Sequence, residues 1–242
     1  MYNDLMPADS YEIRICNSCG LRYPLVDEQT FGTRCPACLG ETRVALSRKL
    51  VTEPTRDGPE FFHREDAERA KDWRKEEAGK NFAVLLDNIR SAWNVGSILR
   101  SADGFGFTHA YLCGITPTPN NETVQKTSLG AEESVTWSYH QDALMVVNDL
   151  KKDGWKVFAL EEDERAITVT NASTEGLDTI SKNARSTGPS AQREVLIVGN
   201  EVTGVDPELL DLCDTIYYIP MHGQKRSFNV AIAFGIAAYA LR

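Results

Sequence analysis

From residue 81 to the end of the chain, short apolar runs alternate with helical patterns, and this alternation restricts the fold more than any other feature. The apolar runs cover 82–86, 110–113, 135–139, 156–160, 194–199 and 215–220. The helical patterns cover 94–103, 142–152, 206–212 and 228–241. Strands and helices in alternation predict an α/β domain, in which a parallel sheet carries helices on both faces. In such sheets, ligands bind beyond the carboxyl ends of the strands. Residues 171–193, rich in Ser, Thr, Asn and Gly, are expected to form a long loop.

The composition is typical of a folded protein in water. Of the 242 residues, 42% are hydrophobic and 25% are charged, which is enough for one or two domains with a full core. The formal net charge of −9 argues against a broad cationic surface that coats nucleic acid or a membrane. The longest apolar stretch, 230–241, is shorter than the ~20 residues that span a bilayer, and the first residues contain no apolar signal region. We therefore expect a soluble, cytoplasmic protein with no membrane partner.

The distribution of charge divides the chain into three parts. Residues 1–50 carry six basic and six acidic side chains, residues 51–80 carry seven and nine, and residues 81–242 carry thirteen and twenty. The middle part begins with a stretch rich in Pro and Gly and continues into a segment in which charged residues predominate. We interpret 51–80 as a charged linker and helix between a small N-terminal domain and the α/β domain at 81–242.

Four of the six cysteines form two Cys-x2-Cys pairs, Cys16 with Cys19 and Cys35 with Cys38, separated by fifteen residues. This spacing predicts a zinc-ribbon-like domain with one four-thiolate site, because each pair can present two sulfurs to the same ion. The zinc would be structural, since four cysteine ligands leave no open position. Two disulfides are disfavoured without a secretion signal. An iron site with the same ligands stays open.

The same N-terminal segment carries basic residues that could contact RNA phosphates. The near-zero net charge of this segment supports a role as a plain scaffold or in a protein contact almost as well as a role in RNA contact. The basic residues are Arg14, Arg22, Arg34, Arg43, Arg48 and Lys49.

Three segments of the α/β domain carry polar residues next to predicted strand ends. The first, 87–106, contains Asn94, a candidate N-cap for the following helix, and Arg100 six positions later. An arginine buried in this otherwise small and apolar helix would need an anionic partner. A structural ion pair explains Arg100 as well as a functional anion does.

The second segment, 196–205, leaves a predicted strand through a glycine-containing loop. Gly199 and Gly204 allow the backbone to approach a ligand closely. The segment has neither a phosphate-binding P-loop nor a dinucleotide fingerprint, which disfavours ATP and nicotinamide enzymes. Glu201 is either a loop carboxylate or an acceptor that orients a substrate.

The third segment, 219–235, passes from a predicted strand through a polar loop into an almost wholly apolar helix. A helix that is apolar on most faces must be buried between other elements or in a subunit interface. Ser227 and Asn229 stand at its start, where capping is the simplest role for them.

In order, spacing and content, these segments resemble the SpoU/TrmH family of SPOUT-class RNA ribose 2′-O-methyltransferases. The resemblance covers about 81–242 and rests on Asn-x5-Arg, Gly-Asn-Glu-x2-Gly and Ile-Pro-Met followed by Ser-x-Asn-Val. It implies methyl transfer from S-adenosyl-L-methionine to tRNA or rRNA, a C-terminal trefoil knot, and a homodimer whose active site draws on both subunits. The family's catalytic motif positions fall on Asn94, Arg100, Glu201, Ser227 and Asn229. Cofactor contacts are expected around Gly199, Asn200, Ile219, Met221 and Phe228.

The resemblance also implies roles for these residues. Arg100 would stabilise the alkoxide that develops on the ribose, since a guanidinium pKa above ~12 makes a role as base expensive. Ser227, Asn229 and Asn94 would orient the ribose and the arginine, and Glu201 would fix the loop or the arginine.

Two further points accompany the resemblance. Lys225 and Arg226 are expected to contact RNA phosphates, and His222 is expected to be a bystander. The alternative to an enzyme is a catalytically silent RNA-binding or scaffold protein that retains the fold.

Overall fold

The structure is a computed structural model that describes residues 10–26, 33–49, 82–171 and 193–241. The linker and helix expected at 51–80 lie outside the described residues, and so does nearly all of the loop expected at 171–193. Among the described residues, no helix is long and apolar enough to cross a membrane.

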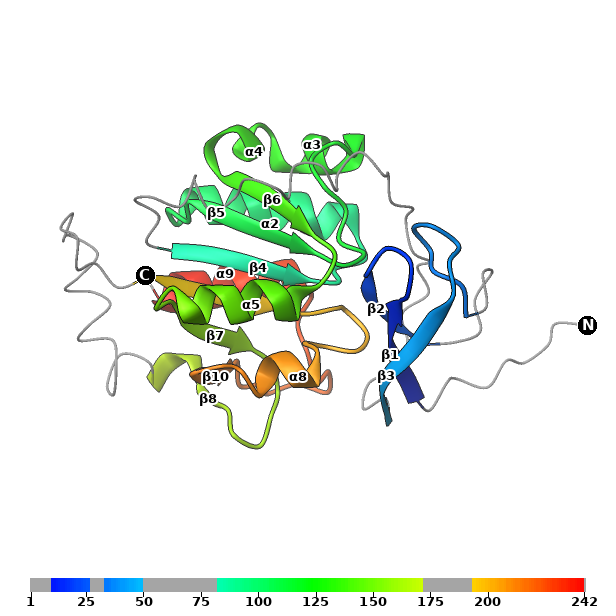
Figure 1. Cartoon of the computed structure of the whole chain (residues 1–242). Coiled ribbons are helices and arrows are strands. Elements are labelled where there is room, and N and C mark those ends of the chain that lie inside the picture. Colours follow the sequence, from blue (N-terminus) through cyan, green and yellow to red (C-terminus); the bar gives the residue numbers. More distant parts are fainter. Residues whose placement is uncertain (1–9, 27–32, 50–81, 172–192, 242) are drawn as a thin grey trace, which may run out of the picture.

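The larger part of the structure is a seven-stranded sheet in which all strands are parallel (Figure 1). In spatial order, the strands are β6 (Thr136–His140), β5 (His109–Cys113), β4 (Phe82–Asp87), β9 (Glu194–Val198), β7 (Lys156–Leu160), β10 (Thr215–Tyr218) and β8 (Ile167–Thr168). Strands β4, β5 and β9 are buried along their whole length, as expected for apolar runs covered on both faces. The predicted parallel α/β sheet is therefore confirmed.

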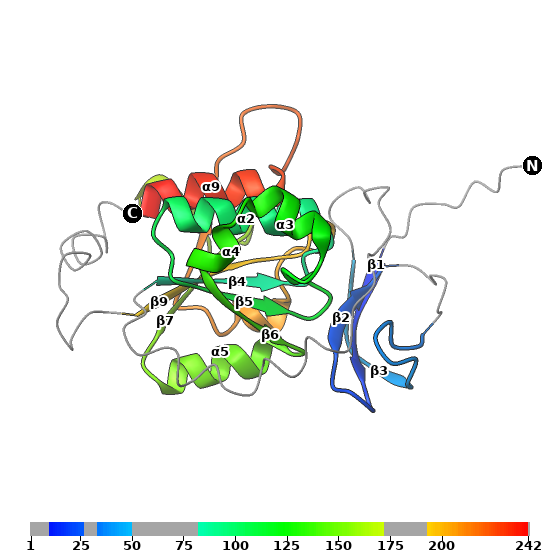
Figure 2. The same ribbon diagram turned by 90° about the horizontal axis from the view of Figure 1, so that it is seen from above.

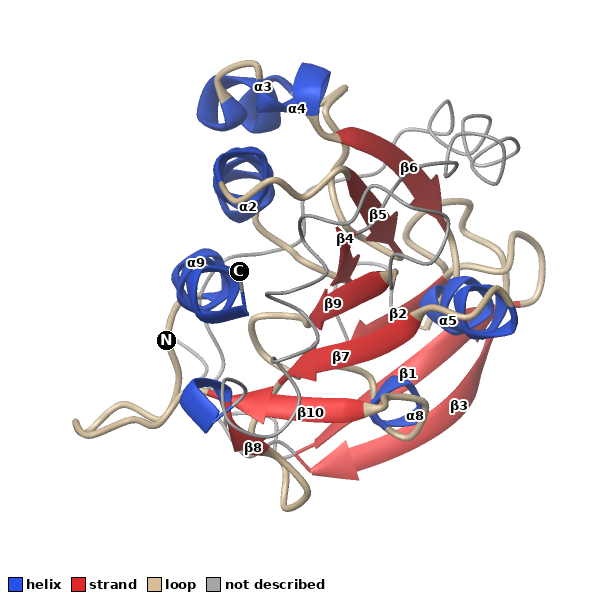
Figure 3. Cartoon of the chain, turned by 90° about the vertical axis from the view of Figure 1, so that its left-hand side faces the viewer, coloured by secondary structure: helices blue, strands red, loops and turns tan. Residues whose placement is uncertain are grey.

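Helices cover both faces of this sheet (Figures 2 and 3). One face carries α2 (Ala92–Gly104), α3 (Glu122–Ser128), α4 (Ala131–Ser134) and α9 (Val230–Leu241). The other carries α5 (Ala143–Lys152) and α8 (Pro207–Leu210). Side chains of β4 alternate between the two cores: Val84 and Leu86 pack toward α2 and α9, whereas Ala83 and Leu85 pack toward α5.

The order of strands in space reverses at the centre of the sheet. From β4 the chain runs outward to β5 and β6, and α5 then carries it across to β7. Strand β9 returns to the gap between β4 and β7. The carboxyl ends of β4, β9, β7 and β10 consequently lie together at the reversal point, where doubly wound sheets bind their ligands.

The N-terminal residues form a separate antiparallel sheet with the order β2–β1–β3. Its strands are β1 (Ser10–Cys16), β2 (Arg22–Leu25) and β3 (Thr42–Lys49). Figure 1 shows this small sheet beside the edge of the large sheet at which β4 and β7 end.

Candidate active site at the carboxyl edge of the sheet

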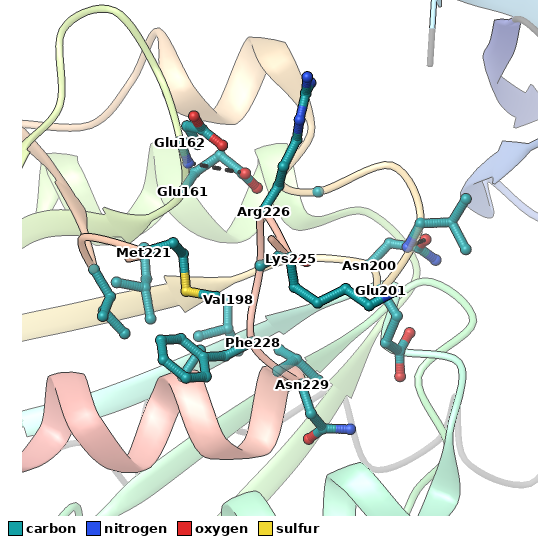
Figure 4. Close-up of a pocket in the computed structure, with 18 of the residues that line it drawn as sticks. Glu161, Glu162, Val198, Asn200, Glu201, Met221, Lys225, Arg226, Phe228 and Asn229 are labelled. Atoms are coloured by element: carbon teal, nitrogen blue, oxygen red, sulfur yellow. Dashed lines mark hydrogen bonds between the residues drawn. The ribbon is translucent and has the colours of Figure 1, made fainter. Parts of the chain in front are cut away.

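A pocket of about 1450 Å³ opens at the carboxyl ends of β4, β7, β9 and β10. Its wall is built from the turn after β4, the turn after β7, the loop after β9, and the segment that connects β10 to α9 (Figure 4). All three motif segments contribute to this wall. The location agrees with the ligand position expected for an α/β sheet of this topology.

Hydrogen bonds join one residue from each motif at this pocket. The carboxylate of Glu201 accepts hydrogen bonds from the backbone N–H of Arg90 (2.8 Å) and Ser91 (3.1 Å), and from Asn94 Nδ2 (2.8 Å). Asn94 Oδ1 in turn accepts from Asn229 Nδ2 at 3.0 Å. Segments more than a hundred positions apart in the chain are thus linked by the side chains that the sequence singled out.

Asn94 is not the N-cap of its helix, so that prediction is wrong. Helix α2 starts at Ala92, and Ser91 takes the cap position without a side-chain cap bond. The carboxylate of Glu201 binds the two amides that lead into the helix, and a negative charge is favourable at a helix N-terminus. This carboxylate from the distant second motif also binds Asn94 Nδ2, and Asn94 Oδ1 accepts from Asn229.

Arg100 does not line the pocket. It lies six residues beyond Asn94, about 9 Å along the helix axis, and its side chain is exposed in the single chain. Among the described residues Arg100 forms no ion pair, so the structural ion pair that was considered for it is not found, and water can solvate the exposed guanidinium. The other four predicted catalytic residues all line the pocket: Asn94, Glu201, Ser227 and Asn229.

The five residues expected around the cofactor also line the pocket: Gly199, Asn200, Ile219, Met221 and Phe228. A Cβ at Gly199 would lie 2.2 Å from the backbone nitrogen of Val205, so only glycine fits there. The amide of Asn200 donates to the Asn88 carbonyl and accepts from the N–H of Val202, which fixes the loop. The side chains of Met221, Val198 and Phe228 gather on one side of the pocket (Figure 4).

Two lining carboxylates were missed in the sequence: Glu161 and Glu162, which directly follow β7. Glu161 accepts from the N–H of Val205 (2.8 Å) and of Glu162 (3.0 Å). Gly204 has a φ of 72°, and a Cβ there would lie 2.3 Å from Glu161 Oε2. Burial raises the pKa of Glu161. The signal that could have identified both carboxylates is their place after a predicted parallel strand.

The mouth of the pocket carries basic side chains in spite of the acidic composition. Lys225 and Arg226 are exposed on the loop before α9, and Arg90 in the turn after β4 also lines the pocket. Trp93 also lines the pocket and is 64% exposed, whereas His222 does not line it. The pocket thus offers cations and an aromatic ring to a ligand that enters from outside.

In the N-terminal sheet, the side chains of Cys16, Cys19, Cys35 and Cys38 converge. Their sulfur atoms all lie within 4.8 Å of one another, and the distances from Cys16 to Cys38 and from Cys19 to Cys35 are 3.5 and 3.6 Å. Four sulfurs around one zinc ion at about 2.3 Å would be about 3.8 Å apart. All four thiols are free, so the arrangement fits one tetrahedral ion and not a pair of disulfides.

Two of the basic residues expected to face RNA are buried in ion pairs instead, which corrects that expectation. Arg14 is 7% exposed and pairs with Glu12, and Arg22 is 4% exposed and pairs with Asp206 and Glu208. The other four basic residues of this unit are exposed: Arg34, Arg43, Arg48 and Lys49.

Comparison with known proteins places residues 81–239 in a single family model, the SpoU rRNA Methylase family. A 23S rRNA (guanosine(2553)-2′-O)-methyltransferase, RlmP of Bacillus subtilis, is 29% identical over 161 residues, which are 66% of this chain and 57% of the relative. A tRNA (guanosine(18)-2′-O)-methyltransferase of Thermus thermophilus is 30% identical over 161 residues, with 66% of this chain and 73% of the relative covered. The match therefore spans just over half of the Bacillus protein.

Solved structures share the fold. The SpoU methyltransferase AviRb from Streptomyces viridochromogenes, in complex with the cofactor AdoMet, aligns with a TM-score of 0.55 at 23% identity, over 67% of this chain and 60% of that chain. An AdoMet-bound rRNA methyltransferase from Sinorhizobium meliloti aligns with a TM-score of 0.57 at 24% identity, over 67% of this chain and 56% of that chain. Both alignments leave about a third of this chain unmatched.

Proposed function

The chain belongs to the SpoU rRNA methylase family, and on this basis we propose that it transfers a methyl group from S-adenosyl-L-methionine to a ribose 2′-hydroxyl of tRNA or rRNA. The observation that carries the proposal is the hydrogen-bonded set of Glu201, Asn94 and Asn229 at the wall of one pocket. A trefoil knot formed by the C-terminal segment belongs to the same proposal.

The pocket fits S-adenosylmethionine. Its volume of about 1450 Å³ exceeds the roughly 300–1,000 Å³ typical of small-molecule sites, which leaves room for part of a nucleotide as well. The close-packed loop at Gly199 presents backbone groups, and Met221 and Phe228 offer an apolar surface to an adenine ring. We propose that Gly199, Asn200, Ile219, Met221 and Phe228 hold the cofactor.

When bound, S-adenosylmethionine supplies a methyl group that is activated by the positive charge on its sulfur. The protein has to align the ribose oxygen with that methyl group and stabilise the charge that develops as the hydroxyl gives up its proton to water. Asn94 and Asn229 are held by their mutual hydrogen bond and can orient the ribose together with Ser227. Arg100 supplies the positive charge next to the developing alkoxide and holds a neighbouring phosphate.

Because Arg100 is exposed and lies outside the pocket of its own chain, we propose that it acts in the pocket of a second copy. Exposed apolar side chains lie on the helix of Arg100, α2, and on α9, which packs against it. Trp93 on α2 is 64% exposed, and Ile232 and Tyr239 on α9 are 56% and 77% exposed. An apolar surface on packed helices is typical of a homodimer interface. The homodimer would thus complete the site and cover this surface.

We further propose that the four cysteines hold one structural zinc ion. Three antiparallel strands bury only a small core, so the ion would contribute directly to the stability of this unit. Purified protein should contain one zinc per chain by atomic emission spectroscopy. One equivalent of iron with thiolate-to-iron absorption bands would identify the iron alternative.

The first test of the proposed function is a calorimetric titration of the purified chain with S-adenosylmethionine, with ATP and NAD as controls. We expect binding of one S-adenosylmethionine per chain and of neither control. A chain that binds RNA but not S-adenosylmethionine would be the catalytically silent RNA-binding protein instead.

A further inference from the structure

We propose that Arg22 of the N-terminal unit is a positioning residue for the cofactor loop at 199–206. The inference rests on the proposed function, since it assigns this loop to S-adenosylmethionine. The family model covers residues 81–239, so Arg22 lies outside the part of the chain that the family model matches.

Arg22 ties the two units together through buried contacts. Its Nε lies 2.7 Å from Asp206 Oδ2, and the two side chains are 5% and 3% exposed. A second guanidinium nitrogen binds Glu208, and the backbone N–H of Arg22 donates to the carbonyl of Gln141 at 2.9 Å. Arg22 thereby makes a forked, charge-assisted contact that a lysine cannot reproduce.

The metal-binding knuckle sets the position of Arg22. The N–H of Cys16 donates to the Leu21 carbonyl at 2.9 Å, and the N–H of Gly20 donates to the Cys16 carbonyl at 3.0 Å. Leu21 is fully buried in a cluster that contains Cys16 and Cys35 and reaches Ile115 of the α/β domain. Arg22 follows directly, so one hydrogen-bonded turn carries two of the four cysteines and leads into the docking arginine.

Asp206 connects Arg22 to the loop that lines the pocket. It directly follows Val205, whose N–H binds the pocket carboxylate Glu161. The N–H of Asp206 donates to Asp87 Oδ2 at 3.1 Å, and its own carboxylate caps α8 by accepting from the N–H of Glu208. A shift of Asp206 would therefore move the turn that closes on Gly199.

Removal of the Arg22 guanidinium would leave the carboxylate of Asp206 buried beside that of Asp87 without a cation. Breaking one side of a buried ion pair is unfavourable because the remaining charge is desolvated and uncompensated. The carboxylate of Asp206 can regain water only if the loop moves. The loss of Arg22 should thus weaken cofactor binding as well as stability.

The test compares S-adenosylmethionine affinities of the full-length, metal-loaded chain. We expect Arg22→Met to weaken binding about tenfold, equivalent to about 1.4 kcal/mol. Asp206→Asn in the Arg22→Met background should restore most of the affinity, because asparagine can still cap α8 and carries no charge. The control is Arg165→Met, which removes two exposed ion pairs, one with Asp163 and one with Asp211, and should leave the affinity unchanged.

Hydrogen exchange of the peptide that contains 199–206 provides a readout that needs no cofactor. We expect faster exchange in Arg22→Met and recovery in the double variant.

If the wild type does not bind S-adenosylmethionine, the proposed function fails while the exchange data still decide the role of Arg22. Unchanged affinity and exchange in a destabilised Arg22→Met chain would overturn the inference, and so would losses that Asp206→Asn does not restore. Should Arg22→Met fail to fold, Arg22→Lys takes its place, with a smaller loss expected in both readouts.

Discussion

Arg100 is the residue whose proposed role depends most directly on its charge. It is exposed on α2, so its replacement should disturb neither the core nor the pocket wall. We predict that Arg100→Ala lowers methyl transfer by about 10²–10³-fold, the range for loss of one charge-stabilising donor. S-adenosylmethionine affinity should stay within about twofold of wild type. The control is Lys152→Ala, an exposed cation at the end of α5. Near-normal turnover by folded Arg100→Ala protein would refute the role.

Asp87 gives a prediction for the dependence of stability on pH. Burial, with the charge of Asp206 as the second cause, raises the pKa of Asp87 to about 7. An unfolded aspartate has a pKa near 3.9. Between these two values the folded chain keeps a proton on Asp87 that the unfolded chain has released, so the contribution of Asp87 to stability should fall as the pH rises from about 4 to about 7.

The slope from Asp87 can reach about 1.4 kcal/mol per pH unit. We expect Asp87→Asn to remove this contribution, and urea unfolding of both proteins at several pH values measures the difference. Parallel pH profiles for wild type and Asp87→Asn would contradict the assignment.

For single residues, the sequence predicted which residues belong to the site better than it predicted the contacts that they make. Asn94 and Glu201 were both singled out, yet Asn94 is not a cap and Glu201 fixes the start of α2. Glu161 was missed, and its role depends on Val205, 44 positions away. Such roles are set by tertiary contacts that no local pattern encodes.

At the scale of elements, the loop between β9 and α8 shapes the pocket through close packing of its own backbone. A Cβ at Gly199 would lie 2.2 Å from Val205 N and 2.3 Å from Gly204 C. We predict that Gly199→Ala displaces this loop and weakens S-adenosylmethionine binding at least about tenfold, because backbone cannot yield as a flexible side chain can.

The matched control for Gly199→Ala is Gly104→Ala, since a Cβ at Gly104 meets nothing within 4 Å. Isothermal titration of both variants decides the outcome. Equal affinities would show that the loop adapts to a side chain at position 199.

The elements themselves were largely predictable. The six expected strands are present, and their ends differ by at most two residues, because strands buried on both faces are continuous apolar runs. Helices α3 and α4 and strand β8 were missed, since segments of seven, four and two residues are too short for a periodic pattern. The apolar helix α9 packs one face on α2 and exposes Ile232 and Tyr239 on another.

At the scale of the whole molecule, the exposed position of Arg100 predicts a site shared between two copies. Mixing Arg100→Ala with Ser227→Ala protein, after exchange of subunits, should give heterodimers in which one of two sites is intact. We expect about a quarter of wild-type activity from the statistical mixture, and far less from either variant alone. If the mixture stays inactive while heterodimers form, Arg100 acts within its own chain or not at all.

The arrangement of the molecule was only partly accessible from the sequence. The spacing of the cysteines predicted that they converge, and they do. The docking of the N-terminal unit through Arg22 was not predictable, because a buried arginine cannot be told from an exposed one in a segment of balanced charge. The contact between Asn94, Glu201 and Asn229 could not be predicted from local patterns either. Only the family resemblance led us to expect it.

The most direct test of the proposed function is methyl transfer itself. Purified protein is incubated with S-adenosylmethionine that carries a trideuterated methyl group and with RNA from cells that lack the gene, and the digested RNA is analysed by mass spectrometry. The proposal predicts the label in a 2′-O-methylated nucleoside within an alkali-resistant dinucleotide. Label on a base, or no label from protein that binds the cofactor, would contradict it.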